Sequence, residues 1–286
     1  MVIATGFFDG AHLGHRLVIN TLVAQARQRG TGSVVVTFWP HPRAVLQKDA
    51  REFRLLTTLE EKRQMLLEMG VDRVEVLPFT REFSTMSAEQ YLREVLIERF
   101  GAEAVVIGYD NRLGSDLMDA EHFALLAQSL HVDVIRPGRF DSAGEAVSST
   151  KIRRAVSEGR MDDASRMLGY DYSLHGVVVA GKQLGRELGY PTANMQLYEP
   201  LKLLPAQGVY AVRVETLGKQ WWGMCNVGPV VETNIFDFDE DIYGLDIKVS
   251  FLARIRDEIK FNSLNLLKKQ LAKDELFCRK YVHDKK

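Results

Sequence analysis

The sequence has few of the features that mark secreted, metal-rich or membrane proteins. Its 286 residues include only two cysteines, Cys225 and Cys278, too few for a disulfide framework or a four-thiolate zinc site. No apolar run approaches the roughly 18 residues that span a bilayer. The first residues, MVIATGFFDGAHLGH, have neither a basic region nor a long apolar core of the kind found in a signal peptide. We therefore expect a cytoplasmic protein without a membrane partner.

An excess of charge of one sign is also missing. Lys and Arg number 37 against 38 Asp and Glu, which gives a net charge of −1. This balance argues against a broad surface for nucleic acid, although it allows a local phosphate pocket. Internal repeats and low-complexity segments are absent, and the length predicts about two domains. The sequence carries no signal for an oligomeric state.

The two halves of the chain have different patterns. In the first half, β-type runs at 2–5, 33–38, 73–77, 104–108 and 132–136 are separated by long stretches, with helical patterns at about 13–30, 60–69 and 88–100. This alternation predicts an α/β domain with a Rossmann-like parallel sheet and helices on both faces. An antiparallel sheet is the alternative, but these spacers are too long for hairpins.

The second half has closely spaced β-type runs at 176–180, 209–215, 221–226, 233–238 and 247–252, then a helical tail at 263–282. Close spacing of this kind predicts an antiparallel β-barrel, here followed by a terminal helix. A single helix at 150–168 is expected between the halves. We therefore predict domains at 1–170 and 171–286.

The first chemical motif, Gly6–His15, follows a predicted strand and opens a helix, where free N–H groups favour phosphate. His12 and His15 lie three apart and share a helix face, and Gly14 lets a ligand approach the backbone. Two imidazoles at one phosphate would stabilise the charge that develops in nucleotidyl transfer. The alternatives are surface or capping histidines, or half of a metal site.

A second feature, Ser148–Arg153, opens a later helix with Ser148, Ser149 and Thr150. The hydroxyls could simply cap the helix. With Lys151 and Arg153 beside them, the same turn could instead hold a phosphate group.

A glycine-rich stretch in the second half precedes two oxygen-bearing side chains. Gly181 and Gly185 allow close approach to a phosphate chain, although hairpin turns between strands are the alternative. Thr192 and Asn194 offer neutral oxygen ligands that suit Mg²⁺. Glu232, at the start of a β-type run, could act as a general base. The acidic run at 237–241 could be a solvated turn.

These motifs resemble the bacterial bifunctional riboflavin kinase/FMN adenylyltransferase (FAD synthetase) family. Its GNFDGVHxGH pattern appears at Gly6–His15, with Phe7 for Asn and Ala11 for Val. Its F-x-P-H-P segment appears at 38–42, and its G-x-D-x-x-F-G loop at 108–114, with Leu113 for Phe.

The second half resembles the riboflavin kinase domain of that family. The pattern G-x-x-x-G-R-x-L-G-x-P-T-A-N is unbroken from Gly181 to Asn194, and E-x-H-x-x-D-F-x-x-D-x-Y-G runs from Glu232 to Gly244, with Asn234 for His. The family's N-I-G-x-x-P-T loop is shortened here to residues 226–231.

The resemblance implies two reactions, with riboflavin, FMN and ATP as substrates and Mg²⁺ as the metal. For adenylyl transfer, it implies that His12 and His15 stabilise the transition state. Substrate or nucleotide contacts are implied there for Gly6, Phe8, Asp9, Gly14, Asp110, Ser148, Ser149, Thr150 and Arg153.

For riboflavin phosphorylation, the resemblance implies Glu232 as the base and Thr192 and Asn194 as metal ligands. Substrate or nucleotide contacts are implied for Gly181, Gly185, Arg186 and Asn226. Three alternatives stay open: an enzyme that retains one of the two activities, a different nucleotidyltransferase, and a flavin-binding protein without turnover. The second domain argues against a different nucleotidyltransferase, and the joint presence of the proposed catalytic and metal residues argues against simple binding.

Overall fold

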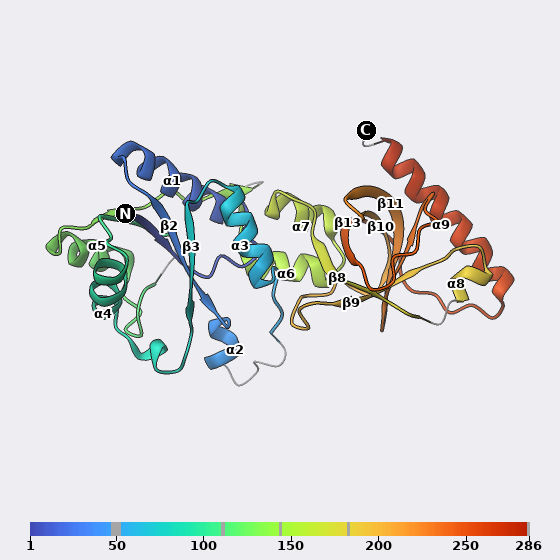
Figure 1. Ribbon diagram of the computed structural model, residues 1–286, viewed down its shortest axis with the longest axis horizontal. Coiled ribbons are helices and arrows are strands. Elements are labelled where there is room, and N and C mark those ends of the chain that lie inside the picture. The colour runs from blue at the N-terminus through green and yellow to red at the C-terminus, as the bar shows by residue number, and fades with distance from the viewer. Residues whose placement is uncertain (47–52, 110–111, 143–144, 182–183, 285–286) are drawn as a thin grey trace. The chain divides into compact units, whose positions relative to one another are not determined.

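The computed structural model describes residues 1–46, 53–109, 112–142, 145–181 and 184–284 (Figure 1). Residue contacts divide the chain into two compact units, Met1–Ser149 and Thr150–Lys286. The domain boundary expected near residue 170 stays a prediction. Among the described residues, no helix combines the length and the apolar character needed to cross a bilayer.

The first unit is built on a parallel sheet of five strands in the order β3-β2-β1-β4-β5. The strands are β1 (Val2–Thr5), β2 (Ser33–Trp39), β3 (Arg73–Pro78), β4 (Ala104–Val106) and β5 (Asp133–Ile135). This architecture confirms the predicted α/β fold. The chain runs from β1 outward to β2 and β3, then crosses to β4 on the other side of β1. The loop after β1 therefore lies at the switch point of the sheet, where such folds bind ligands.

Helices cover both faces of this sheet because successive strand residues point to opposite sides. Val35 packs with α1 (Leu13–Arg29) and α3 (Leu59–Glu68) on one face, while Val34 and Val36 pack with the helices of the other face. That second set comprises α4 (Ala88–Gln90), the π-helix η2 (Tyr91–Arg99) and α5 (Ala120–Ser129). The smaller elements of the unit are α2 (Pro42–Leu46), the 3₁₀ turn η1 (Phe83–Thr85), β6 (Asp141–Ser142) and β7 (Glu145–Ala146).

The single helix expected at 150–168 is wrong in one respect, since the segment forms two helices. These are α6 (Ser149–Ser157) and α7 (Met161–Leu168). Gly159 lies between them with a φ of 72°, in the left-handed region that favours glycine. A Cβ at this position would come within 2.6 Å of Arg254 Cδ and 2.9 Å of the Tyr210 hydroxyl. The contacts with Arg254 and Tyr210 therefore require a glycine at this position.

The second unit is a closed antiparallel barrel, as predicted, with strands in the order β10-β11-β12-β9-β8-β13. The strands are β8 (Ser173–Val179), β9 (Ala193–Leu197), β10 (Gly208–Thr216), β11 (Lys219–Val227), β12 (Val231–Ile235) and β13 (Asp246–Arg256). Strand β9 is additional to the sequence prediction, and it completes the ring by pairing with both β8 and β12. A short helix, α8 (Leu184–Glu187), precedes β9.

The terminal helix α9 (Leu264–Asp284) packs on the outer face of β10 and β11 (Figure 1). Cys278 is buried there in a cluster with Ala211 and Met224. Leu264 and Leu276, which belong to the apolar pattern of the tail, are 52% and 71% exposed. The helix thus covers one side of the barrel, and its buried face leaves out these two leucines.

Two candidate active sites

The first candidate site is the loop Gly6–His12, which follows β1 at the switch point of the sheet. Phe8, Gly10 and Ala11 all have positive φ, at 53°, 80° and 36°. Positive φ at two non-glycine residues is uncommon, so the surroundings must hold this loop in place. A Cβ at Gly6 would lie 3.3 Å from the Phe8 ring, so glycine suits that packing.

The two histidines lie together at the start of α1. His12 caps the helix, and its Nδ1 accepts a hydrogen bond of 3.2 Å from the backbone N–H of His15. The proton of a neutral His12 therefore sits on Nε2. The two rings stack with centroids 3.6 Å apart and an angle of 15° between their planes. A Cβ at Gly14 would come within 3.2 Å of the His12 ring, so a glycine fits beside this stack.

The environment of His15 favours its uncharged form. Burial lowers the pKa of His15 well below 6.5, and the nearby charges of His12 and Lys62 lower it further. Its Nδ1 is buried and has no hydrogen-bond partner among the described residues. The Phe8 ring meets the His15 ring edge-on, with centroids 5.3 Å apart. His15 is therefore a neutral group held between two rings, with one buried ring nitrogen that has no hydrogen-bond partner among the described residues.

Asp9 holds the loop against the segment that precedes α3. Its carboxylate is 3% exposed and accepts hydrogen bonds from the backbone N–H groups of Leu56 (3.1 Å) and Thr57 (3.0 Å). The hydroxyl of Thr57 donates to the same carboxylate and accepts from Gly10 N–H. Ser149 Oγ donates to the backbone oxygen of Asp9 at 3.0 Å, so the first residue of α6 also meets the loop.

Of the other residues expected at this site, all but Asp110 lie in the part of the chain that the structure describes. Ser148 directly precedes α6, and Thr150 and Arg153 lie on that helix. Asp110 lies outside the described residues.

Lys62, on α3, is a residue of this region that the sequence analysis did not select. It is 1% exposed, and its Nζ donates to the Phe7 backbone oxygen and to Thr37 Oγ1, both at 3.0 Å. Burial lowers the pKa of Lys62 to about 8, against the raising effect of Asp9. One signal was available, because Lys62 is four residues before the buried Leu66 and therefore lies on the apolar face of α3.

The second candidate site is a row of polar residues on three neighbouring strands. Asn194 on β9 is the direct partner of Glu232 on β12, and Glu232 is the direct partner of Asn226 on β11. Direct partners on adjacent strands face the same side of a sheet, so the three side chains share one face. The shortened loop is a tight hairpin at its tip, where Gly228 N–H donates to Val230 O at 3.2 Å. It keeps Asn226 opposite Glu232.

A cavity of about 360 Å³ lies next to Glu232 on the side that α9 covers. Its polar lining includes Asn226, Thr192 and Arg256, and its apolar lining includes Leu188, Val209, Met224, Ile259, Phe261, Leu267 and Leu271. Asp274 of α9, which is 1% exposed, holds Arg256 through contacts of 3.0 Å to Nε and 2.7 Å to Nη2. Gln270 donates to the same carboxylate. Neither Arg256 nor Asp274 was predicted from the sequence to belong to a site.

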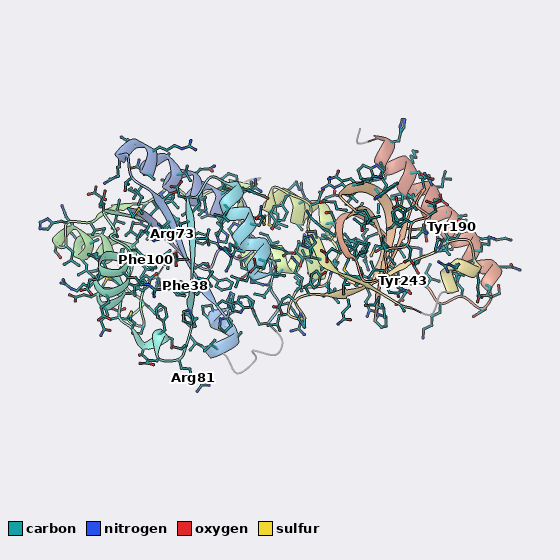
Figure 2. All side chains as sticks on the ribbon, viewed as in Figure 1. Phe38, Arg73, Arg81, Phe100, Tyr190 and Tyr243 are labelled. Carbon is teal, nitrogen blue, oxygen red and sulfur yellow. The ribbon has the colours of Figure 1, made fainter. Side chains whose placement is uncertain are left out.

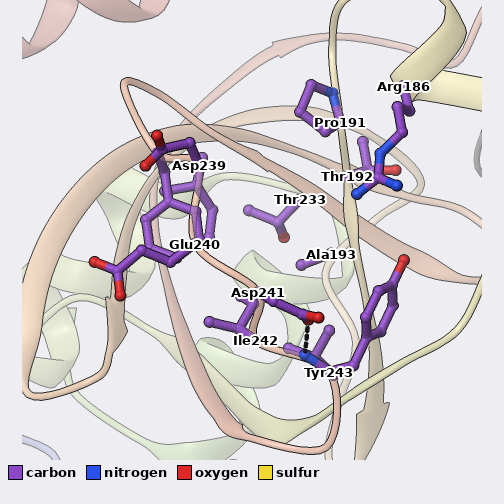
Figure 3. A pocket seen from close by; sticks show the side chains of 13 residues that line it. Arg186, Pro191, Thr192, Ala193, Thr233, Asp239, Glu240, Asp241, Ile242 and Tyr243 are labelled. Atoms are coloured by element: carbon purple, nitrogen blue, oxygen red, sulfur yellow. Dashed lines mark hydrogen bonds between the residues drawn. The ribbon is translucent and has the colours of Figure 1, made fainter.

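A second cavity, also of about 360 Å³, shares Thr192 with the first. Arg186 and Thr192 lie on one side of it, and Asp239, Glu240 and Asp241 lie across from them (Figure 3). Asp241 accepts a hydrogen bond of 3.0 Å from the N–H of Tyr243. Tyr190 lines the cavity beside α9, and Tyr243 lines the second cavity. Figure 2 shows the two tyrosines at separate places on the second unit. Thr192 is thus the link between two ligand-sized spaces.

The glycine-rich stretch lies directly on the two predicted metal ligands. A Cβ at Gly181 would lie 2.1 Å from Asn194 Nδ2, and one at Gly185 would lie 3.4 Å from Thr192 Oγ1. Only a glycine lets the backbone rest on the Asn194 amide in this way. Neutral oxygens beside a stretch of this kind, with the Glu232 carboxylate on the next strand, fit Mg²⁺. Asn234 keeps the adjoining turn in place by donating to Pro191 O at 2.7 Å.

Comparisons with known proteins divide the chain in a similar way. The family model described as FAD synthetase matches residues 1–151, and the model described as riboflavin kinase matches residues 168–282. A protein of Listeria monocytogenes is 35% identical over 294 residues, which cover 98% of this chain and 92% of that protein. A protein of Escherichia coli strain K12 has the same identity and coverage. Both are named bifunctional riboflavin kinase/FMN adenylyltransferase.

A solved structure shares the fold over almost the whole chain. It is described as a macrolide-efflux protein from Streptococcus pneumoniae, and it is 33% identical with a TM-score of 0.88. The match covers 97% of this chain and 93% of that one.

Proposed function

The chain belongs to the family of bifunctional riboflavin kinases/FMN adenylyltransferases, and from this membership we propose which residues perform its two reactions. It contains both the FAD synthetase and the riboflavin kinase domains. It is therefore an enzyme of flavin cofactor synthesis with two activities. One phosphorylates riboflavin with ATP to give FMN and ADP, and the other adenylylates FMN with ATP to give FAD and pyrophosphate.

We assign adenylyl transfer to the loop Gly6–His12 and the start of α1. An FMN phosphate oxygen attacks the α-phosphorus of ATP, the bond to the β-phosphate oxygen breaks, and pyrophosphate leaves. The attacking group is already an anion and needs no base. His12 Nε2–H and a neutral His15 donate to the charge on the α-phosphate, beside the N–H groups of α1. The stacked histidine pair at a helix start is the observation that supports this assignment.

The remaining residues of the first site have three kinds of role. Gly6, Phe8, Asp9 and Gly14 keep the loop in its shape, as their packing and hydrogen bonds support. Ser148, Ser149, Thr150 and Arg153 bind the leaving pyrophosphate through hydroxyl, N–H and guanidinium donors. Asp110, from the family's flavin-side loop, is assigned to substrate on the resemblance alone.

We assign riboflavin phosphorylation to Glu232 and the two cavities that meet at Thr192. Glu232 takes the proton of the ribityl 5′-hydroxyl, whose oxygen attacks the γ-phosphorus of ATP as the bond to ADP breaks. The apolar cavity under α9, with Asn226 at its edge, suits the isoalloxazine ring. The backbone at Gly181 and Gly185, together with Arg186, suits the ATP phosphates on the other side. The cross-strand row that includes Glu232, which lines the cavity under α9, supports this arrangement.

Thr192 and Asn194 are the residues that would hold Mg²⁺ in the kinase site. When bound, the ion neutralises charge on the ATP phosphates. Both side chains provide neutral oxygens, which leaves positions for phosphate oxygens and waters. The contact of Gly181 and Gly185 with these two side chains supports a shared site for metal and phosphate.

We further propose that the enzyme works in the cytoplasm on riboflavin, FMN and ATP, without a nucleic acid or membrane partner. Both cysteines are free and buried, which suits a reducing compartment. The net charge of −1 gives no reason to expect a polyanionic partner.

The test is a pair of variants assayed for each reaction by chromatography of riboflavin, FMN and FAD. His15→Ala should reduce FAD formation by about 100-fold or more while FMN accumulates. Glu232→Gln should reduce FMN formation by roughly 100- to 10,000-fold and leave FAD formation from supplied FMN intact.

The matched controls are His122→Ala and Glu215→Gln, which change the same residue types on exposed or ion-paired positions away from both sites. If a folded variant lost both activities, the sites would not be independent. If the wild type made no product from either flavin, the chain would bind flavins without turnover. If it made only FMN or only FAD, one activity would have been lost.

A further inference from the structure

A buried lysine joins three separate elements of the first unit behind the histidine loop. Lys62 Nζ on α3 donates to the Phe7 backbone oxygen, in the loop after β1, and to Thr37 Oγ1 on β2. The Thr37 hydroxyl donates to the same Phe7 oxygen at 3.3 Å, which closes a triangle of hydrogen bonds. The ammonium also lies 3.9 Å from the centre of the Phe7 ring. All of these contacts converge on one peptide of the loop.

That peptide leads directly to the histidine pair. The Phe7 carbonyl belongs to the bond between Phe7 and Phe8, and Phe8 has the left-handed φ of 53°. From that conformation the Phe8 ring meets His15 edge-on. Fixing the Phe7 carbonyl therefore fixes the ring against which His15 rests. A residue on α3 thus acts on the geometry of His15 without touching it through a hydrogen bond.

The same ammonium is one of the charges that act on His15. The titratable groups around this region are His12 and Asp9 from the loop, Lys62 from α3, and His41, whose ring packs on Phe7 at 3.8 Å. Burial has the largest effect in lowering the pKa of His15, and the charges of His12 and then Lys62 lower it further. Asp9 acts on Lys62 in the opposite direction, because it favours the charged ammonium.

We propose that Lys62 is a positioning residue for adenylyl transfer, which holds the Phe7–Phe8 peptide that carries the ring packed against His15. Its positive charge adds to the effect of burial and of His12 on His15. This inference rests on the proposed role of the histidine pair. A buried ammonium needs acceptors wherever it lies, and what ties Lys62 to this site is that its backbone acceptor, the Phe7 oxygen, belongs to the histidine loop. The roles assigned above use no group from α3, so Lys62 adds α3 to the elements that form the site.

Two variants separate geometry from charge. Lys62→Gln removes the charge but keeps a donor for the Phe7 carbonyl, whereas Lys62→Met removes both. The rate of FAD formation from FMN is measured across pH, and the riboflavin kinase rate of the same sample reports on the other site. Arg63→Gln is the matched control, because it removes a neighbouring charge from the exposed face of α3.

Loss of the charge should raise the pKa of His15. The acid limb of FAD formation should therefore move to higher pH in both variants, by roughly 0.5 to 1 pH unit. Lys62→Met should also lower kcat by about 10-fold or more, and Lys62→Gln by less, because glutamine preserves part of the geometry. Kinase rates and the Arg63→Gln profile should match those of the wild type.

Titration of the His15 ring by NMR in wild type and Lys62→Gln provides a readout that does not depend on turnover. The inference is overturned if neither the acid limb nor the His15 titration moves in a folded variant. His15→Ala is assayed in parallel. If that variant keeps FAD formation, the proposed function of the site fails by itself, whatever Lys62 does.

Discussion

The two units handle phosphate groups in different physical settings. The first buries its ionisable groups: Asp9 and Lys62 are 3% and 1% exposed, and the pKa of Lys62 is lowered to about 8. The second places the row of Asn226, Glu232 and Asn194 on one face of its barrel strands, where Glu232 lines a cavity of about 360 Å³. The first site is therefore adjusted by burial and neighbouring charge, and the second by which residues the strand ladder sets opposite one another.

The difference follows from the architecture of each unit. A parallel sheet brings ligands to loops at the ends of its strands, so the loop itself must be held, here by Asp9 and Lys62. An antiparallel ladder fixes side chains without further help, because Asn194, Glu232 and Asn226 face one side by register alone. What the second unit adds from outside the ladder is the ion pair between Arg256 and Asp274.

The largest expected effect comes from breaking the buried ion pair of the second unit, between Arg256 and Asp274. Asp274→Ala leaves Arg256 without its carboxylate partner in a largely buried position. Removal of one partner from such a pair costs about 3–5 kcal/mol. The second unit should unfold at lower temperature, and the KM for riboflavin should rise, because Arg256 lines that cavity. Thermal unfolding and kinase assays measure both effects.

The control for this prediction is Glu275→Ala, on the same helix, which breaks a more exposed pair with Arg279. Its cost should stay below about 1 kcal/mol. Equal losses in the two variants would contradict the idea that burial of the Arg256 pair matters.

A smaller effect concerns the Mg²⁺ ligands that are proposed for the second unit. Thr192→Val removes one oxygen with little change of shape, and should lower the riboflavin kinase rate on the order of 100-fold, or about 2.7 kcal/mol. The apparent affinity for Mg²⁺ should fall as well, which a magnesium titration measures. Thr216→Val, which removes a buried hydroxyl elsewhere in the barrel, is the control. A similar loss in both would assign the effect to barrel stability.

The smallest effect concerns the pH dependence of stability in the first unit. The unfolded chain holds the Lys62 proton up to a pKa near 10.5, but the folded state releases it at about 8. Between these values the unfolded state binds more protons, so the free energy of unfolding rises with pH. The gain from Lys62 should be about 1 kcal/mol between about pH 7 and about pH 9. Denaturant unfolding at the two pH values should show it in wild type and not in Lys62→Met.

Most of the fold could be predicted from sequence because its signals are local. Runs of β-branched residues and the spacing between them are enough for the parallel sheet and the barrel, and the helical pattern at 263–282 is enough for the terminal helix. Strand β9 was missed because Ala193–Leu197 contains amide and methionine side chains, and its strand character depends on partners at both edges. The break at Gly159 depends on Arg254 and Tyr210, which are distant in sequence.

The candidate sites show the same division between local and distant contributions. His12 and His15, or Thr192 and Asn194, come from short motifs and can be read from a single segment. Lys62 comes from another helix, so only the tertiary structure reveals its contact with Phe7. The buried face of α9 was equally hidden, because it includes the charged Asp274 while Leu276 points to solvent. Hydrophobic periodicity cannot detect a buried ion pair.

The hairpin between Asn226 and Glu232 also limits how this sequence can change in length. Side chains alternate along a strand, so one residue inserted into β11 or β12 would turn Asn226 or Glu232 to the opposite face of the barrel. The tip at 228–230 has no such restriction, because residues gained or lost there leave the pairing of Asn226 with Glu232 intact. Evolution can therefore shorten or extend this tip, while the flanking strands accept substitutions but not single-residue insertions or deletions.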